Sequence, residues 1–248
     1  MTGDVLLEVR GVSISFGALR AVQGIDLEVR RGQVTSVIGP NGAGKSTLFN
    51  LISGNLSPSA GYVALEGRRL SGRPVHEISV LGLGRSFQIT NLFFDLTVME
   101  NLLVAAQVLE PRQRLLRDPR FSGRAQARAE QLLHQFGLAA KERELAGHLS
   151  HGEQRRLEIA VSLAAEPRLL LLDEPTQGMA HEDTAETAAL IRRLAEDITI
   201  LLIEHDVGLV MDISDHVMVM HMGRKLAEGT PSQIRADERV LDAYLGRG

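Results

Sequence analysis

The chain of 248 residues contains no cysteine. Disulfides, thiolate zinc sites and thiol catalysis are therefore excluded, and the composition is compatible with a reducing compartment. No apolar run approaches the ~20 residues that span a bilayer, and residues 1–10 lack the basic and apolar regions of a secretory signal. The sequence therefore predicts a cytoplasmic protein with no membrane segment of its own.

An excess of positive charge is also missing. The 27 Lys and Arg residues are outnumbered by 31 Asp and Glu residues, which gives a formal net charge of -4. Nucleic-acid binding needs concentrated basic surface, so no nucleic-acid partner is expected. The 44% of hydrophobic residues instead favours a single globular domain over 1–248 with a sizeable core.

The apolar pattern alternates between strand and helix periodicity. Alternating apolar residues at 6–14 and 25–29 predict short antiparallel strands near the N-terminus. Near-continuous apolar runs at 34–38, 169–172 and 198–203 predict buried parallel strands, and segments with helical spacing separate them. This pattern predicts an α/β fold with a parallel-sheet core and an N-terminal antiparallel β-layer.

The stretch from Thr97 to Ala164 has helical spacing without a strand pattern. We expect a helical subdomain over 91–164, inserted into a core formed by 1–90 and 165–248. Its basic residues favour a solvated face over a contact with anionic lipid or a partner. They are Arg112, Arg114, Arg117, Arg120, Arg124 and Arg128.

A glycine-rich loop follows the apolar run 34–38. It consists of Gly39, Pro40, Asn41, Gly42, Ala43, Gly44, Lys45, Ser46 and Thr47. Between a strand and a helix, the backbone N–H groups of such a loop point into one concavity that cradles phosphates. Lys45 is expected to reach the outer phosphates of a nucleotide, and Ser46 its magnesium ion.

Two carboxylates end the apolar run 169–172. Ligands of α/β proteins bind at the carboxyl ends of strands, which is where Asp173 and Glu174 lie. Because strand residues alternate between faces, the two acids are expected to differ in role. Asp173 is placed to hold magnesium through its hydration shell, and Glu174 to orient or deprotonate the water that attacks the γ-phosphate. The alternative is a pair that merely caps a strand end at the surface.

A third motif, Leu-Ser-His-Gly-Glu-Gln at 149–154, precedes a helical segment. Alone, it is typical of an ordinary helix N-cap with acidic support. Taken in order with the P-loop, Gln88, the Asp-Glu pair and His205, it resembles the ATP-binding-cassette ATPases over essentially the whole chain. The resemblance implies a P-loop NTPase fold, ATP hydrolysis, and ATP and Mg²⁺ as ligands.

The resemblance also implies roles for single residues in this third motif. The family signature Leu-Ser-Gly-Gly-Gln binds the γ-phosphate of the ATP held by the opposite subunit through hydroxyl, N–H groups and helix dipole. Ser150 and Gly152 match it, whereas His151 and Glu153 depart from it. The nucleotide-contacting set here is Ser150, His151, Gly152, Glu153 and Gln154.

Other positions match the family one by one. Gln88 matches the glutamine that touches magnesium and the attacking water, and His205 the histidine that contacts the γ-phosphate. Phe16 lies where the family keeps an aromatic residue that stacks on adenine, with a plain core phenylalanine as the alternative. The implied catalytic residues are Lys45, Gln88, Glu174 and His205, and the implied metal site is Ser46, Gln88 and Asp173.

Several strings resemble the ATP-binding subunits of bacterial importers for branched-chain amino acids. They lie at 85–88, 91–93, 96–102, 155–160, 202–206 and 243–246. The resemblance implies a dimer with a second, similar cassette, permease subunits that hold the chain at the cytoplasmic face of the inner membrane, and a periplasmic solute-binding protein. A groove near 88–101 would receive the permease's cytoplasmic helix.

Four alternatives are weighed against the sequence. Related importers handle urea, short amides or other small polar solutes, and a lipid or lipopolysaccharide exporter would share every catalytic residue. A soluble cassette protein acting on ribosomes or DNA usually has two cassettes or a coiled-coil insertion, and this chain has neither pattern. Intact Lys45, Asp173, Glu174 and His205 argue against a non-hydrolysing regulatory cassette.

Overall fold

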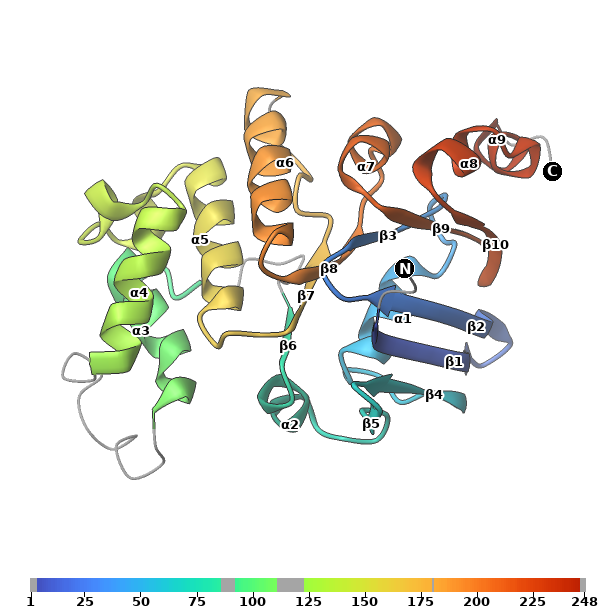
Figure 1. The fold of residues 1–248 in the computed structure, drawn as a ribbon, viewed down its shortest axis with the longest axis horizontal. Coiled ribbons are helices and arrows are strands. Elements are labelled where there is room, and N and C mark those ends of the chain that lie inside the picture. The colour runs from blue at the N-terminus through green and yellow to red at the C-terminus, as the bar shows by residue number, and fades with distance from the viewer. Residues whose placement is uncertain (1–3, 86–91, 111–122, 180, 246–248) are drawn as a thin grey trace. The chain divides into compact units, whose positions relative to one another are not determined.

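The computed structural model describes residues 4–85, 92–110, 123–179 and 181–245. The chain forms two compact units (Figure 1). Unit 1 comprises 1–83, 168–174 and 188–248, and unit 2 comprises 84–167 and 175–187. Gln88 and four of the six arginines, Arg112, Arg114, Arg117 and Arg120, lie outside the described residues.

The N-terminal β-layer of unit 1 is an antiparallel sheet of order β2-β1-β4-β5. The strands β1 (Val5–Phe16) and β2 (Leu19–Arg30) pair antiparallel, which confirms the predicted N-terminal strands. The sheet continues through β4 (Ala60–Leu65) and β5 (Arg68–Arg69), which the sequence pattern did not predict. In β4 the sequence Ala-Gly-Tyr-Val-Ala-Leu has no charged residue to mark an alternation of period two.

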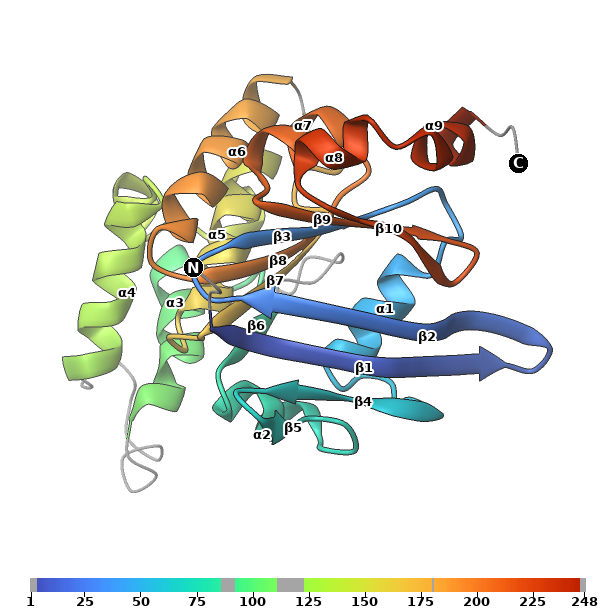
Figure 2. The ribbon, with the colours of Figure 1, turned by 45° about the vertical axis from the view of Figure 1, so that its right-hand side comes forward.

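The second sheet is mixed and has the order β10-β9-β3-β8-β7-β6 (Figure 2). Its strands are β3 (Val34–Ile38), β6 (Leu83–Arg85), β7 (Leu169–Asp173), β8 (Thr199–Ile203), β9 (His216–His221) and β10 (Arg224–Gly229). The pairs β3–β8, β3–β9 and β7–β8 are parallel. Every residue of β3, β7 and β8 is buried, as their continuous apolar runs predicted.

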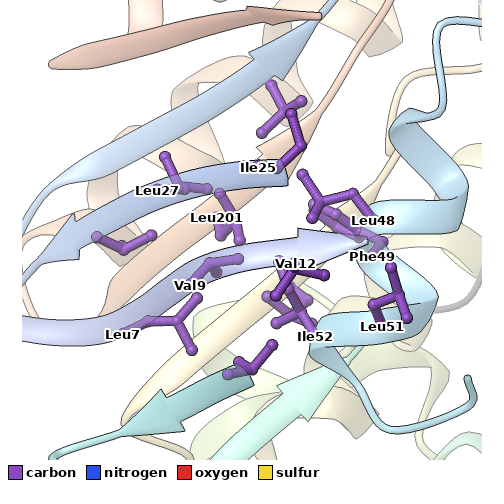
Figure 3. Close-up of a cluster of buried hydrophobic side chains, with 14 of the residues drawn as sticks. Leu7, Val9, Val12, Ile25, Leu27, Leu48, Phe49, Leu51, Ile52 and Leu201 are labelled. Carbon is purple, nitrogen blue, oxygen red and sulfur yellow. The ribbon is translucent and has the colours of Figure 1, made fainter. Parts of the chain in front are cut away.

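The main hydrophobic core of unit 1 joins both sheets to the helix α1 (Lys45–Ile52). Figure 3 shows Leu48, Phe49, Leu51 and Ile52 of α1 with side chains of β1, β2 and β8. Burial of each such side chain stabilises the fold by about 1.5–3 kcal/mol. The helix that follows the P-loop is therefore fixed by packing along its length.

A second cluster in unit 1 involves three helices near the C-terminus. They are α7 (Val207–Ile213), α8 (Pro231–Arg235) and α9 (Glu238–Leu245). Successive strand residues point to opposite faces of a sheet. Accordingly Val37 belongs to the main core, while Ile38 belongs to the cluster that contains Val210, Ile234 and Val240. Both faces of β3 are thus packed up to the residue before the P-loop.

Unit 2 is built around α3 (Val98–Ala106), α4 (Gly123–Gln135) and α5 (His151–Leu163). The helices predicted within 97–136 are confirmed, and Gly137 takes the positive φ of 66° typical of a helix end. Short 3-10 turns lie at Gln107–Leu109, Ala139–Lys141 and Ala146–His148. Unit 2 also takes in 175–187, with the first part of α6 (His181–Ala195), a stretch that the sequence assigned to the core.

Two of the six arginines lie in the described part of unit 2. Arg124 forms an exposed ion pair with Glu166 at 3.1 Å. Arg128 donates from Nη2 to the carbonyl of Leu163 at 2.8 Å and is partly buried. Arg128 therefore links α4 to the end of α5, unlike a residue of a solvated face.

None of the helices in the described residues has the length and apolar character that a membrane span requires.

Candidate functional site

The glycine-rich loop lies between β3 and α1 in unit 1, as predicted. Gly39 and Gly44 have positive φ angles of 151° and 98°. A Cβ atom at Gly39 would lie 2.1 Å from the carbonyl oxygen of Met220, and one at Gly44 would lie 2.4 Å from that of Ala21. Only glycine allows the backbone to approach neighbouring strands so closely.

A cavity of about 720 Å³ opens beside this loop. Its lining consists of Ala18, Leu19, Arg20, Ala21, Gln23, Asn41, Gly42, Ala43, Gly44, Lys45, Ser46, Thr47, Glu174, Met222 and Gly223. The volume falls within the range of small-molecule and cofactor sites, about 300–1,000 Å³. Most of the predicted loop lines the cavity, whereas Gly39 and Pro40 lie outside the lining set.

The Lys45 side chain is held by the loop itself. Its Nζ donates to the carbonyl oxygens of Gly39 at 2.7 Å and Pro40 at 3.2 Å. Burial lowers the pKa of Lys45, and the negative charges of Glu174 and Asp173 act against this shift. The ammonium group therefore sits in a partly desolvated place near both carboxylates, where a charged phosphate would be a favourable partner.

The two carboxylates predicted at the end of β7 have different surroundings. Asp173 is the last strand residue and is 1% exposed. Glu174 lines the cavity, has a positive φ of 47°, and donates its backbone N–H to the Ile203 carbonyl at 2.9 Å. The break in strand geometry at Glu174 turns its side chain to a different environment from that of Asp173.

His205 follows β8, and its side chain is 55% exposed. It is not among the cavity-lining residues. The preceding Glu204 is fully buried, and its Oε2 lies 3.5 Å from His205 Nδ1 and accepts the His205 backbone N–H at 3.2 Å. Sequence reasoning missed Glu204, although a charged residue directly after an apolar strand was a usable signal.

The predicted adenine contact, Phe16, lies at the end of β1 and is 48% exposed. It does not line the cavity. Two other exposed apolar side chains do, Leu19 at 66% and Met222 at 72%. Met222 could not be found from the sequence pattern, because the β9–β10 turn reaches the loop only through the fold. Its Gly223 N–H donates to the Ala43 carbonyl at 3.0 Å.

In unit 2, Ser150 is the N-cap of α5. Its hydroxyl accepts the Glu153 N–H at 3.3 Å, and Glu153 accepts the Ser150 N–H at 2.9 Å. This capping box lowers the pKa of Glu153, chiefly through the backbone hydrogen bond from Ser150. Gln154 donates to the carbonyl oxygens of Ala146 and Leu149, both at 3.2 Å. Glu153, a departure from the family signature, thus has a clear role in starting the helix.

The oxygen donors beside the P-loop suit magnesium, which phosphates and water help to hold, better than a metal ion bound by protein side chains alone. Among the described residues, no three His, Cys, Asp or Glu side chains converge on a metal-binding point. Mg²⁺ is usually bound through one or two carboxylates together with phosphates and water. The Ser46 hydroxyl and the buried Asp173 carboxylate are hard oxygen donors of that kind.

A strand–loop–helix phosphate cradle, a cavity beside it and a carboxylate just after β7 define a nucleotide hydrolase of the P-loop class. The family model described as "ABC transporter" matches residues 22–177. The chain therefore belongs to the ABC transporter family, and it is an ATPase with the α/β fold that the sequence predicted. A second model, "Branched-chain amino acid ATP-binding cassette transporter", matches residues 224–248.

Known relatives cover nearly the full chain. The "High-affinity branched-chain amino acid transport ATP-binding protein" BraF of Pseudomonas aeruginosa is 44% identical, over 97% of this chain and 98% of its own. LivG of Escherichia coli (strain K12), which has the same description, is also 44% identical over these shares. LptB of Acidithiobacillus ferridurans, a "Lipopolysaccharide export system ATP-binding protein", is 35% identical over 97% of both chains.

A solved structure shows the same fold. The ADP conformation of MJ1267, an ATP-binding cassette of an ABC transporter, superposes with a TM-score of 0.88 and is 30% identical. The match covers 98% of this chain and 99% of that one.

Proposed function

We propose that this chain is the ATP-hydrolysing subunit of an importer for branched-chain amino acids or a similar small polar solute. The observation that carries the proposal is the match of residues 224–248 to a model specific to branched-chain amino acid cassettes, outside the general ABC match. The higher identity to BraF and LivG, 44% against 35% for LptB, supports import over lipopolysaccharide export.

In the proposed cycle, ATP occupies the cavity with its phosphates on the N–H groups of the P-loop and the Lys45 ammonium. Ser46, Asp173 and Gln88 would hold Mg²⁺, which neutralises phosphate charge when bound. Glu174 orients or deprotonates the attacking water, and His205 contacts the γ-phosphate. The assignment of Glu174 is supported by its place in the cavity lining.

A second cassette completes the site. Ser150 and the N-terminus of α5 bind the γ-phosphate of the ATP held by the opposite subunit, which the exposed position of Ser150 and His151 at the helix start supports. ATP therefore joins two cassettes and hydrolysis releases them. The second cassette is a similar subunit encoded separately.

The permease is the remaining direct partner, and it holds the chain at the cytoplasmic face of the inner membrane. Residues 88–101 would receive its cytoplasmic helix. Exposed apolar side chains in the described part of unit 2 support this: Phe93, Phe94 and Val104 are 57%, 45% and 41% exposed. A periplasmic solute-binding protein delivers the solute to the permease.

Uptake of labelled leucine by cells that lack this chain tests the proposal. The wild-type chain should restore uptake and Glu174→Gln should not, while an excess of unlabelled isoleucine or valine should compete. If urea or a short amide competed and isoleucine and valine did not, the transported solute would be assigned to that other class. Full uptake without the chain would contradict its role in import.

A further inference from the structure

The segment that follows Glu174 packs against α5, the helix that begins with the signature motif, at three points within unit 2. The Arg155 Nε donates to the Pro175 carbonyl oxygen at 3.0 Å. Arg156 lies 3.7 Å from Glu186, and a Cβ atom at Gly152 would lie only 3.3 Å from Asp183. Helix α5 and residues 175–187 therefore pack as one assembly, consistent with their grouping in a single unit.

Arg155 is the buried member of this set. Its Nη1 lies 2.6 Å from Glu158 Oε2, one helical turn along α5, and the two side chains are 9% and 7% exposed. A buried ion pair stabilises little by itself, because desolvation offsets the attraction. It does hold the guanidinium in one orientation, and that orientation directs Nε at the Pro175 carbonyl.

The Pro175 carbonyl matters because of the residue before it. Glu174 has a φ of 47°, a strained backbone conformation for a non-glycine residue, and a residue before proline prefers extended backbone. On one side, its own N–H is tied to the Ile203 carbonyl at 2.9 Å. On the C-terminal side, Pro175 has no N–H to donate. Its carbonyl oxygen, which accepts from Arg155 Nε, is the backbone polar group of Pro175 that can hold the chain there.

We propose that Arg155 is a positioning residue that fixes the backbone of Glu174 by holding the Pro175 carbonyl. It thereby links the helix that begins at Ser150 to the carboxylate that activates water. This inference rests on the proposed roles of Glu174 and Ser150. The effect on Glu174 passes through the Glu174–Pro175 peptide bond of the same chain.

Three variants in the assembled transporter test the proposal. Arg155→Met combined with Glu158→Met removes the donor without leaving a buried charge. Glu158→Gln removes the charge of the ion pair but keeps a side-chain oxygen that can accept from Arg155 Nη1, so the Arg155 donor keeps its orientation. Arg128→Met is the matched control, because Arg128 also donates to a backbone carbonyl of unit 2, that of Leu163 at the far end of α5.

The double variant should lower kcat about tenfold or more, as expected for a misplaced catalytic group, and leave the KM for ATP unchanged. Glu158→Gln and Arg128→Met should keep most of kcat. Thermal unfolding should show modest shifts for the double variant and Arg128→Met, and a larger shift for Glu158→Gln, which leaves the buried Arg155 charge without its carboxylate. Unchanged kcat in the double variant, or an equal loss of kcat in Arg128→Met, would overturn the assignment of Arg155.

A dimerisation assay separates Arg155 from the signature itself. Placed in a Glu174→Gln background, the double variant should still form an ATP-dependent dimer, because the N-cap of α5 is intact. Loss of that dimer would mean that Arg155 shapes the signature, and the proposal would be wrong. Undiminished turnover of the single variant Glu174→Gln would instead contradict the proposed role of Glu174. Because this result comes from a different variant, it is distinguishable from a failure of the Arg155 proposal.

Discussion

The carboxylate of Glu204, which is fully buried, lies 3.5 Å from Nδ1 of His205. A buried carboxyl group this close to an imidazole restrains the orientation of the ring. His205 is the proposed γ-phosphate contact, and its side chain is otherwise half-exposed. The sequence pointed to His205, whereas its contact with Glu204 was found only in the structure.

Glu204→Gln keeps the shape of the side chain but replaces the carboxyl group beside His205 with an amide. This loss should lower kcat. We expect a loss of about three- to tenfold, with little change in ATP affinity. Steady-state ATPase measurements on the assembled transporter check this. Wild-type kcat in a folded Glu204→Gln protein would leave Glu204 with a purely structural role.

The glycines of the P-loop should differ sharply in their tolerance of alanine. Gly39→Ala places a Cβ 2.1 Å from the Met220 carbonyl, so it should lower the free energy of unfolding by about 3 kcal/mol or prevent folding. Gly42 has a φ of 79° and open space around its Cβ position, so Gly42→Ala should cost about 1–2 kcal/mol. Chemical denaturation of the two variants measures the difference, and equal losses would argue against the close backbone approach.

The capping box at the start of α5 should make stability depend on pH. The pKa of Glu153 is held below its ordinary value of 4.5, so its contribution is present above that pH and is lost as pH falls through the lower folded-state pKa. Ser150→Ala should lower the free energy of unfolding by about 1 kcal/mol at neutral pH. Glu153→Ala removes the carboxylate that accepts the Ser150 N–H, so its effect should shrink at acid pH, below the folded-state pKa. Thermal unfolding of wild type and Glu153→Ala across pH 3–7 tests this, and a gap that stayed constant would contradict it.

Glu174→Gln should bind ATP normally, stall turnover and accumulate a dimer. The reason is that the P-loop and Lys45 remain intact while the group that activates water is lost. Lys45→Met is the companion variant, and it should lose ATP affinity as well as turnover. Binding by fluorescent nucleotide and size-exclusion chromatography with ATP separate these outcomes. A monomeric, fully active Glu174→Gln protein would rule out the proposed mechanism.

What could be predicted from the sequence depends on how local each feature is. The P-loop, the Asp173–Glu174 pair and the α5 cap are set by short stretches whose residue types dictate backbone and contacts, so spacing alone located them. Near-continuous apolar runs likewise predicted the buried strands β3, β7 and β8. Family resemblance then supplied roles that no spacing could give, such as that of Gln88.

Features made by distant segments could not be predicted in the same way. Met222 reaches the cavity because the β9–β10 turn is tied to the P-loop by the Gly223–Ala43 hydrogen bond. The contact between Arg155 and Pro175 joins residues twenty positions apart through tertiary packing. Residues 175–187 join unit 2 for the same reason, since their contacts with α5 outweigh their place in the chain after β7.

This chain is proposed to drive solute import together with a permease and a second cassette. Affinity purification of the tagged chain from its native membranes, followed by mass spectrometry of the proteins that accompany it, tests whether those partners exist. We predict multi-span permease subunits, a second and similar cassette, and a solute-binding protein whose ligand is a branched-chain amino acid. Recovery only in a soluble complex, without any membrane protein, would contradict the account despite intact ATPase motifs.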